Sequence, residues 1–331
     1  MENEKFLVCV NCMTYNQKEY ITDAMNGFVM QRTTFPFLCV ITDDASTDGE
    51  PEVIKNYLDG NFDRQDIGLS TPDETDEYLR IYARHRENKN CYFCVLLLKY
   101  NHYSVGKAKH GSIAELLSSI GYRALCEGDD YWTDPMKLQK QVDFLEGHPD
   151  FSLCFHKVKV WKEKEGIMTD DFLTREVPQE TELCDLAEGN YIHTLSVVYR
   201  NNERVGVFRT QLGNVIMGDY VCWMACAQYG KIWKMSECMA VYRYGSGIWS
   251  NKSLLIRLIE TFSVLNRLYP LIDSLNAKNK LEEQIWSVKK TIISECNMLE
   301  EKYLSILNSH SFRLGEMLIK PYRWLKRVLN R

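Results

Sequence analysis

The first part of the chain alternates strand-like and helix-like patterns, and this alternation restricts the possible folds more than any other feature. Residues 6–12 form an apolar run typical of a buried strand, and apolar residues within 21–29 recur at the three-and-four spacing of an amphipathic helix. The unit then repeats, with a strand at 37–43 and a helix whose apolar stripe includes Val53 and Leu58. Strands that alternate with helices predict a mostly parallel sheet covered by helices.

The same alternation continues further along the chain. Apolar runs predict strands at 92–98 and 122–126, and Asp134 with Pro135 predicts the start of a helix that stops at Gly147. Later patterns predict strands at 152–160, 196–200 and 239–244, a short helix ending at Gly189 and a helix at 220–229, and from Ser250 onward the pattern is helical. The predicted organisation is a sheet domain at 1–250, a helical extension at 251–310 and a basic amphipathic tail at 311–331.

Residues 61–90 interrupt this pattern. The stretch is polar, with an acidic segment at 73–77, and it is longer than the usual connection between a helix and the next strand. We therefore expect an insertion that contains one short helix.

Composition limits the class of protein. The 331 residues are 45% hydrophobic and 26% charged, which is enough apolar material for a sizeable core and excludes a disordered or collagen-like chain. No run of about eighteen apolar residues is present, and acidic residues stand at the start, where an export signal needs basic ones. The expected location is the cytoplasm.

Twelve cysteines require an explanation in such a chain. The pairs Cys9/Cys12 and Cys91/Cys94 have the spacing of half zinc sites, but both lie in runs that are predicted to be buried strands. Residues three apart on a strand point to opposite faces, so neither pair can grip one metal. The sequence therefore predicts reduced, buried cysteines that act as small hydrophobic residues.

Charge is distributed unevenly. Residues 311–331 contain six basic residues and one acid, so the tail carries +5 and residues 1–310 carry −10 of the total of −5. An acidic body argues against nucleic acid as the main partner. The tail combines arginine and lysine with Trp324 and leucines, a composition that suits a helix on an anionic membrane surface; a helix packed on the domain is the alternative. We expect peripheral binding to the inner face of the cell membrane.

Polar residues follow three of the predicted strands, at the edge where open parallel sheets bind ligands. They are Thr14, Tyr15 and Asn16 after the first strand, Asp43, Asp44, Ser46, Thr47 and Asp48 after the second, and Glu127, Asp129 and Asp130 after the fourth. Helix capping is an alternative for Ser46, Thr47 and Asp48, but it does not explain two adjacent acids at the end of a buried strand. Three crowded carboxylates at 127–130 favour a hard cation such as Mg²⁺ or Mn²⁺ over a solvated turn.

Four motifs in order resemble the family 2 glycosyltransferases of the GT-A fold. They are the loop at 14–16, the acidic run at 43–48, the segment at 127–132 and Gly218-Asp219-Tyr220 before a helix, and the resemblance covers about residues 6–250. It implies a Rossmann-like mixed sheet with helices on both faces. It also implies an inverting transfer of a sugar from a nucleotide-diphosphate donor to an acceptor hydroxyl, in the assembly of a cell-surface glycan with a glycan or lipid-linked acceptor.

The resemblance also assigns roles to individual residues. Thr14, Tyr15, Asn16 and either Asp43 or Asp44 would hold the base and ribose of the donor. In the family's Asp-x-Asp signature, Glu127 takes the first acidic place, and Asp129 would ligate the metal at the diphosphate. Asp130 would be an outer contact to metal or sugar. Asp219 matches the catalytic base, with helix capping as its alternative.

Three departures from the family pattern stand out. Met13 replaces a frequent proline, Glu127 replaces the usual aspartate, and residues 242–250 lack the late histidine that often assists metal or diphosphate. Arg243 or Ser246 could serve the phosphates instead, and a structural ion pair is an equal alternative for Arg243. We expect Lys107 and Lys109 in a solvated loop.

The histidines at 102, 110, 156 and 193 lack metal-like spacing, so we expect satisfied surface or core residues. A nucleotidyltransferase is the main alternative enzyme, but its glycine-rich, basic first loop is missing here. A catalytically inactive scaffold of a glycan-assembly complex is the alternative from another class.

Overall fold

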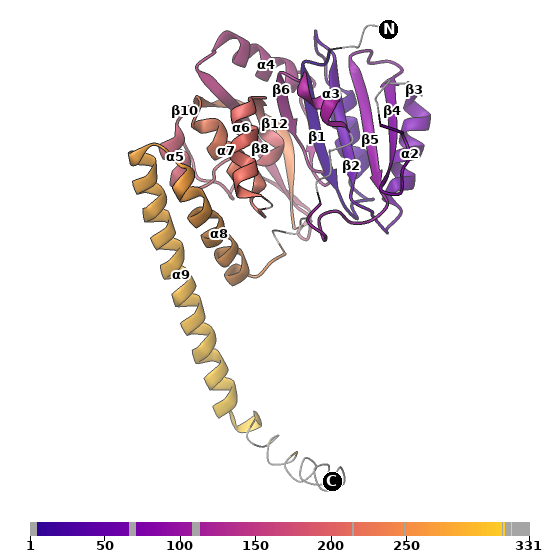
Figure 1. Cartoon of the computed structure of the whole chain (residues 1–331). Coiled ribbons are helices and arrows are strands. Elements are labelled where there is room, and N and C mark those ends of the chain that lie inside the picture. The colour runs from indigo at the N-terminus through magenta and orange to yellow at the C-terminus, as the bar shows by residue number, and fades with distance from the viewer. Residues whose placement is uncertain are drawn as a thin grey trace.

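The computed structural model describes residues 5–65, 71–107, 113–213, 215–245 and 251–312, together with Gly247, Trp249, Leu314 and Ile319. Within these residues one twelve-stranded mixed sheet runs in the order β10-β12-β8-β11-β6-β1-β2-β5-β4-β3, with β7 added to β12 and β9 to β8 (Figure 1). The strands are β1 (Val8–Thr14), β2 (Phe37–Asp43), β3 (Phe62–Arg64), β4 (Tyr78–His85), β5 (Cys91–Leu98), β6 (Tyr122–Leu125), β7 (Tyr131–Trp132), β8 (Phe151–Lys162), β9 (Ile167–Asp170), β10 (Glu180–Thr181), β11 (Val198–Arg200) and β12 (Lys231–Tyr244).

The centre of the sheet is parallel. β1 pairs in parallel with β2 and β6, and β2 pairs in parallel with β5. β2 and β5 are buried along their whole length because helices cover both faces, which is why their sequences are continuous apolar runs rather than alternating ones. The register sets Thr14 opposite Asp43, so the polar loops after β1 and β2 begin side by side.

The helices divide between the two faces of the sheet. On one face α1 (Ile21–Val29), α2 (Glu50–Asn61) and α4 (Lys137–Gly147) share a core with alternate residues of β1, β2 and β5. On the other face lie α3 (Ala114–Ser118) and, over β8 and β11, a helical layer. That layer consists of α5 (Leu183–Ala187), α6 (Glu203–Leu212), α7 (Gly218–Ala227), α8 (Leu254–Leu268) and the start of α9 (Leu275–Asn308).

Most predicted elements are confirmed to within a few residues, and the cysteine interpretation is confirmed as well. Cys9 and Cys94 pack in the core of one sheet face while Cys12 and Cys91 pack in that of the other, all fully buried. A mixed sheet with helices on both faces is the predicted fold class, and the structure confirms it.

Three details differ from the sequence analysis. The described part of the expected insertion forms the antiparallel edge strands β3 and β4 instead of one short helix. Gly60 lies inside α2 rather than after its end. Helix α6 was not expected at all. Its buried side chains, Val205, Phe208 and Leu212, have the helical spacing of three and four residues, but Val207 is apolar and exposed, which weakens the contrast between the two faces of the helix.

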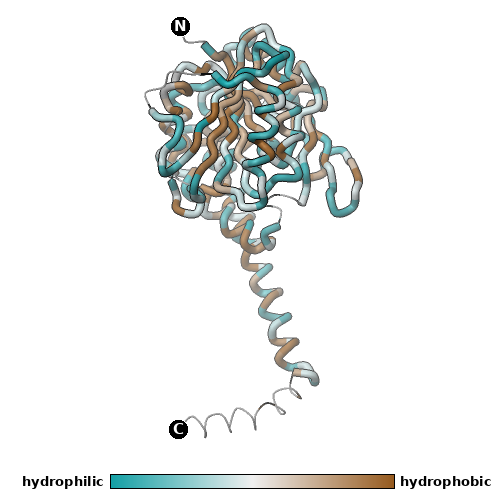
Figure 2. The backbone as a smooth tube through the Cα atoms, turned by 90° about the vertical axis from the view of Figure 1, so that its right-hand side faces the viewer, coloured by the Kyte–Doolittle hydropathy of each residue, from teal (hydrophilic) through white to brown (hydrophobic). Residues whose placement is uncertain are grey.

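Helix α9 leaves the body of the molecule. Its first turns pack against α8 and α5, and the rest extends away from the sheet domain (Figure 1; brown and teal segments of α9 in Figure 2). No helix in the described part of the chain is long and apolar enough to cross a membrane. The tail beyond Phe312 lies outside the described residues except for Leu314 and Ile319.

Candidate active site

Three loops converge at the carboxyl edge of the parallel strands. The loops after β1 and β2 start side by side at Thr14 and Asp43. The loop after β6 joins them, because the amide of Gly128 donates to the carbonyl oxygen of Met13 at 3.0 Å. The predicted meeting of these loops at one edge is therefore observed.

Gly128 allows the acidic turn to press against the first loop. A Cβ at this position would lie 2.4 Å from Thr14 Oγ1 and 2.6 Å from Gln17 Oε1, far inside contact distance. The approach therefore requires glycine, and it places Glu127 and Asp129 directly beside the loop after β1.

Glu50 ties two of the loops together. This fully buried carboxylate, in the first turn of α2, accepts hydrogen bonds from the Thr14 hydroxyl, from the Gln17 amide at 2.9 Å and from Ser46 Oγ at 2.9 Å. Burial raises its pKa, and these hydrogen bonds oppose the rise. Sequence analysis missed Glu50 because an acid in the first turn of a helix is ordinary there.

Asn16 and Ala45 have left-handed backbone conformations, with φ of 54° and 64°. Asn16 is held by two contacts, because its amide donates to Ser46 Oγ at 2.8 Å and its Oδ1 accepts from the Thr47 amide at 2.8 Å. Non-glycine residues adopt this region at a cost and cluster at functional sites. Tyr15, next to Asn16, is 41% exposed, so part of its side chain is accessible to solvent at the sheet edge.

The two acids that end β2 have different surroundings. Asp43 is fully buried, its Oδ1 accepts from the Ser46 amide at 3.0 Å, and its Oδ2 has no hydrogen-bond partner. Asp44 is also buried, but both of its oxygens accept backbone amides, those of His102 at 2.7 Å and Tyr103 at 3.1 Å. Asp44 therefore holds the loop after β5 in place. Asp43 Oδ2, in contrast, has no hydrogen-bond partner among the described residues and could accept a hydrogen bond from a ligand.

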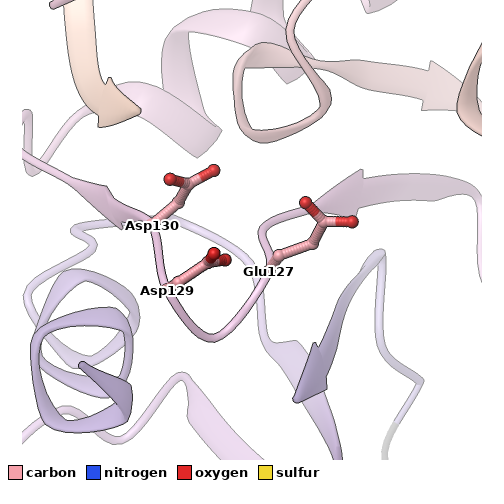
Figure 3. A group of neighbouring side chains, drawn as sticks. All are labelled: Glu127, Asp129 and Asp130. Carbon is pink, nitrogen blue, oxygen red and sulfur yellow. The ribbon is translucent and has the colours of Figure 1, made fainter. Parts of the chain in front are cut away.

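Glu127, Asp129 and Asp130 form a cluster of carboxylates in one tight turn. One oxygen from each lies within 4.8 Å of the others, and Figure 3 shows the three side chains turned toward a shared space. Asp129 and Asp130 are buried, whereas the side chain of Glu127 is accessible to solvent. Asp130 Oδ1 accepts from the Arg243 amide at 2.8 Å and its Oδ2 has no partner.

The electrostatics of this cluster suit a divalent cation. Although Glu127 is accessible, the surrounding protein and the charges of Asp129 and Asp219 raise its pKa to about 8. Burial and the neighbouring carboxylates also raise the pKa of Asp130 well above its ordinary value. A hard cation with oxygen ligands would neutralise this excess negative charge, so the residues fit Mg²⁺ or Mn²⁺.

Arg243 holds the acidic turn through hydrogen bonds to Asp129 and Asp130. Its guanidinium donates to the carbonyl oxygen of Asp129 at 2.7 Å and pairs with Asp23 of α1. The same group lies between the rings of Tyr20 and Tyr131, 4.9 and 4.7 Å from their centroids. The structural ion pair left open by the sequence is therefore present, while Ser246, the other candidate, lies outside the described residues.

Asp219, the predicted catalytic base, lies in the first turn of α7. Burial raises its pKa, and hydrogen bonds to the backbone amides of Tyr220 and of Asp219 itself oppose the rise. Thr194 Oγ1 donates to Asp219 Oδ2 at 3.4 Å. The helix is capped at Met217 without a side-chain hydrogen bond, so Asp219 is not its N-cap residue.

Tyr242 of β12 lies within electrostatic range of both groups of acids. Burial raises its pKa, and the charges of Asp130, Glu127, Asp129 and Asp219 raise it further. The charge of Asp219 also raises the pKa of Glu127, so the four carboxylates share one electrostatic environment.

His193 is a largely buried histidine with a polar partner, as expected, and it lies beside Tyr242. Its Nε2 lies 3.0 Å from Asp171 Oδ2, its ring centroid is 5.0 Å from that of Tyr242, and its charge acts on Asp219. No local motif signals this contact, because Asp171 comes from the variable segment after β9. His156 is buried, with Nδ1 2.7 Å from the Lys157 carbonyl oxygen.

The remaining candidates lie elsewhere. Lys107 pairs with Glu77 and donates to the Tyr100 hydroxyl at 2.8 Å in an exposed loop, as expected. His102 is buried beside Asp44. Lys109 and His110 lie outside the described residues.

Comparison with known proteins identifies chains that are similar in sequence. No family model matches the sequence. Uncharacterised proteins of Mycobacterium tuberculosis and Mycobacterium bovis are 36% identical over 240 residues, which cover 72% of this chain and 59% of theirs. The chain thus spans 59% of the length of these relatives. TuaG of Bacillus subtilis, provisionally named as a glycosyltransferase of teichuronic acid biosynthesis, is 26% identical over 256 residues, 76% of this chain and 85% of TuaG.

Solved structures agree in fold. S. aureus TarS (residues 1–349) in complex with UDP aligns with a TM-score of 0.52 at 16% identity, over 85% of this chain and 70% of that one. The mannosyltransferase PcManGT of Pyrobaculum calidifontis, in complex with GDP-Man and Mn²⁺, aligns at 0.51 and 12%, over 93% of this chain and 82% of that one. The resemblance predicted from the four motifs is therefore confirmed in three dimensions: the chain has the GT-A fold, and its structural neighbours are glycosyltransferases of that fold.

Proposed function

We propose that the protein is a metal-dependent, inverting glycosyltransferase that moves a sugar from a nucleotide-diphosphate donor to an acceptor hydroxyl. The observation that carries this proposal is a cluster of three carboxylates, Glu127, Asp129 and Asp130, with a fourth carboxylate within electrostatic range. That fourth carboxylate is Asp219, in the first turn of α7, and burial raises its pKa.

The donor side of the site would use the converging loops. Tyr15 offers a ring to the base, while Asn16 and Asp43 offer polar groups to the ribose. Asp44 contributes indirectly, because its oxygens hold the loop after β5. Asp129 would ligate the metal with Glu127 beside it, and the unpartnered oxygen of Asp130 would contact metal or sugar. A bound Mg²⁺ or Mn²⁺ would stabilise the negative charge of the departing diphosphate.

The acceptor side would use Asp219 as general base. The acceptor oxygen forms a bond to the anomeric carbon as the bond from that carbon to the diphosphate breaks, and Asp219 takes the hydroxyl proton. Attack from the face opposite the diphosphate inverts the configuration. Burial raises the pKa of Asp219 above its ordinary value, which makes its carboxylate a stronger base toward the acceptor hydroxyl.

The similarity to TuaG suggests the setting of this reaction. We infer an acceptor that is a glycan or a lipid-linked intermediate of cell-surface polysaccharide assembly, met at the inner face of the membrane. The basic tail would bring the enzyme to that surface.

The test is turnover of nucleotide sugars by the purified full chain. A panel of UDP-sugars and GDP-mannose is incubated with Mn²⁺ or Mg²⁺, and release of the nucleotide diphosphate is measured. Asp129→Ala should abolish both turnover and Mn²⁺ binding, and activity should disappear in excess chelator. Full activity with chelator present would overturn metal dependence.

The role of Asp219 has its own test. Asp219→Asn should lower kcat about 10²–10⁴-fold while donor affinity stays nearly unchanged, because the amide keeps the shape but cannot take a proton. An equal loss of donor binding would move Asp219 to the donor side. Donor binding without turnover in the unaltered chain, across the panel and with acceptors supplied, would favour the inactive scaffold.

A further inference from the structure

The outer part of α9 carries an apolar stripe that nothing in the described chain covers. Five residues form this stripe, which we term the outer seam. They are Ile292, Cys296, Leu299, Tyr303 and Ile306, and the last three are 47%, 60% and 51% exposed. Figure 2 shows this stretch of α9 extending beyond the body of the molecule.

The inner part of the same helix has an identified partner. Ala277 and Leu281 are fully buried, and Ile285 and Val288 pack at the edge of the core formed by α5, α7 and α8. The apolar stripe thus begins as a packed interface and continues outward past Val288. The outer seam continues the packed stripe of α9 beyond the point where α5, α7 and α8 cover it.

A helix of this length is not stable by itself. Residues 289–308 span about 30 Å at 1.5 Å per residue, and isolated helices in water are marginal because tertiary packing supplies most of the stability of protein helices. The outer seam therefore needs a partner that buries it.

The spacing of the outer seam identifies the kind of partner. Its residues follow one another at intervals of four, three, four and three, which is the apolar repeat of a coiled coil. The side chains directly opposite it, Ser294, Asn297 and Glu301 among them, are polar. Ile293, Met298 and Leu304 are exposed apolar residues outside the seam. Such a seam fits another helix with the same repeat.

Charge favours a helix of a second copy over a lipid surface. Residues 289–308 contain three acids and three lysines, so this part of the helix has no net positive charge to attract it to an anionic bilayer. Glu295 and Lys302 flank the seam on the same side, seven residues apart. In an antiparallel pair equivalent flanks meet, and each Glu295 then faces Lys302 of the other copy.

Four of the five seam residues agree with the same alignment. When Cys296 of one helix lies opposite Leu299 of the other, Ile292 lies opposite Tyr303, and each of these layers occurs twice by symmetry. Ile306 then lies opposite Lys289, whose aliphatic stem can pack on it while the ammonium group stays in water. A parallel pair would instead set Glu295 near Glu300 of the second copy, a repulsive contact.

We propose that two copies of this chain associate through the outer seams of their α9 helices, in an antiparallel coiled coil. The inference rests on α9 alone and is independent of the proposed enzymatic function. The body of each copy lies at an opposite end of the pair.

The first test is the mass in solution of the full chain. Sedimentation equilibrium over a concentration series should approach twice the chain mass of 38.7 kDa. Leu299→Asp places a charge in the seam and should reduce the mass to that of one chain, whereas the control Ser294→Asp, on the exposed opposite face, should leave the dimer intact. A single-chain mass for the unaltered protein, or a dimer that survives Leu299→Asp, overturns the proposal.

The second test is the direction of the helices. In a chain with Cys238→Ser and Cys296→Ser, the variants Ile292→Cys and Tyr303→Cys are prepared separately and oxidised alone or mixed. Antiparallel pairing predicts a disulfide-linked dimer only in the mixture, because identical positions then lie about 16 Å apart along the axis. Cross-linking of each variant with itself overturns the antiparallel arrangement.

Lipid is tested in parallel. The unaltered protein and Leu299→Asp are sedimented with phosphatidylglycerol vesicles. The proposal predicts that the double variant Leu299→Ala, Tyr303→Ala has a lower dimer fraction than the unaltered protein in the absence of lipid. If the unaltered protein is a single chain without lipid and a substitution in the seam changes vesicle binding, the proposal is overturned in favour of a membrane surface.

Discussion

A buried lysine next to the acidic turn makes stability depend on pH. Lys137 is fully buried, its Nζ donates to Gln141 Oε1 at 2.7 Å, and it lies 4.1 Å from the centroid of the Trp132 ring. Burial lowers its pKa to about 7. Between pH 7 and the ordinary lysine range, the unfolded chain therefore binds a proton that the folded chain has lost, so this residue's contribution to stability rises with pH.

Lys137→Met removes this titration and keeps the shape of the side chain. We expect the free energy of unfolding of the unaltered protein to increase relative to the variant as pH rises from about 7 to 10, measured by urea unfolding at several pH values. Lys140→Met, an exposed lysine of the same helix paired with Asp134, serves as the control. A flat difference between the unaltered protein and Lys137→Met would contradict this account.

Arg243 offers a second prediction for a single residue. Its guanidinium holds the Asp129 carbonyl oxygen, and its backbone amide holds Asp130, so it positions the acidic turn from behind. Arg243→Met should weaken Mn²⁺ binding about 10–100-fold, as measured by calorimetry, because partners that orient metal ligands have effects of that size.

Asp23→Asn provides the graded comparison, because it weakens one contact of Arg243 and leaves the turn's own residues unchanged. The loss should be smaller than for Arg243→Met. If the affinity for Mn²⁺ stays unchanged in Arg243→Met while nucleotide affinity falls, the guanidinium contacts phosphate and does not position the acidic turn.

The loop between β6 and β7 depends on its single glycine. Gly128→Ala adds a Cβ that overlaps Thr14 and Gln17, so the turn has to move away from the loop after β1. We expect weaker binding of Mn²⁺ and of UDP, each measured by calorimetry, with a cooperative unfolding transition still present. Gly60→Ala in α2, where a Cβ meets no atom within 4 Å, should leave both affinities unchanged.

The regular elements could be predicted from the sequence because their signals are local. β2 was predicted at its observed bounds, Phe37–Asp43, since a fully buried strand is a continuous apolar run. β3 and β4 escaped prediction, because polar, arginine-containing sequences such as Tyr78–His85 lack a continuous apolar run.

The candidate site also contains residues that local sequence patterns indicate and residues that they do not. Asp129 and Asp219 could be proposed from the sequence because each stands near the end of a strand or at the start of a helix, where motifs are readable. The contacts of Glu50, His193 and Asp171 were not predicted, because they join segments far apart in the chain: Glu50 with the loop after β1, and His193 with the segment after β9. Such contacts depend on packing, which no local pattern encodes.

At the scale of the whole molecule, the charge of the chain and the direction of α9 act together. The body carries −10 and the tail at 311–331 carries +5, and α9 leads away from the body toward the tail. The described residues include only a few of the tail, so its role remains a prediction from sequence. An acidic body gains from standing away from an anionic bilayer, and a projecting helix provides that separation.

The full chain should therefore bind anionic vesicles through the tail, with Trp324 and the leucines in the interface and the basic residues at the head groups, each worth about 1 kcal/mol near the surface. Deletion after His310 should release the protein, and salt should weaken binding of the full chain by screening. Paired copies carry two tails, so Leu299→Asp should bind more weakly than Ser294→Asp although both keep the tail. Co-sedimentation with phosphatidylglycerol vesicles at low and high salt measures all four proteins. If the full chain stays in the supernatant at low salt, the tail is a packing helix and the enzyme reaches its acceptor by another route.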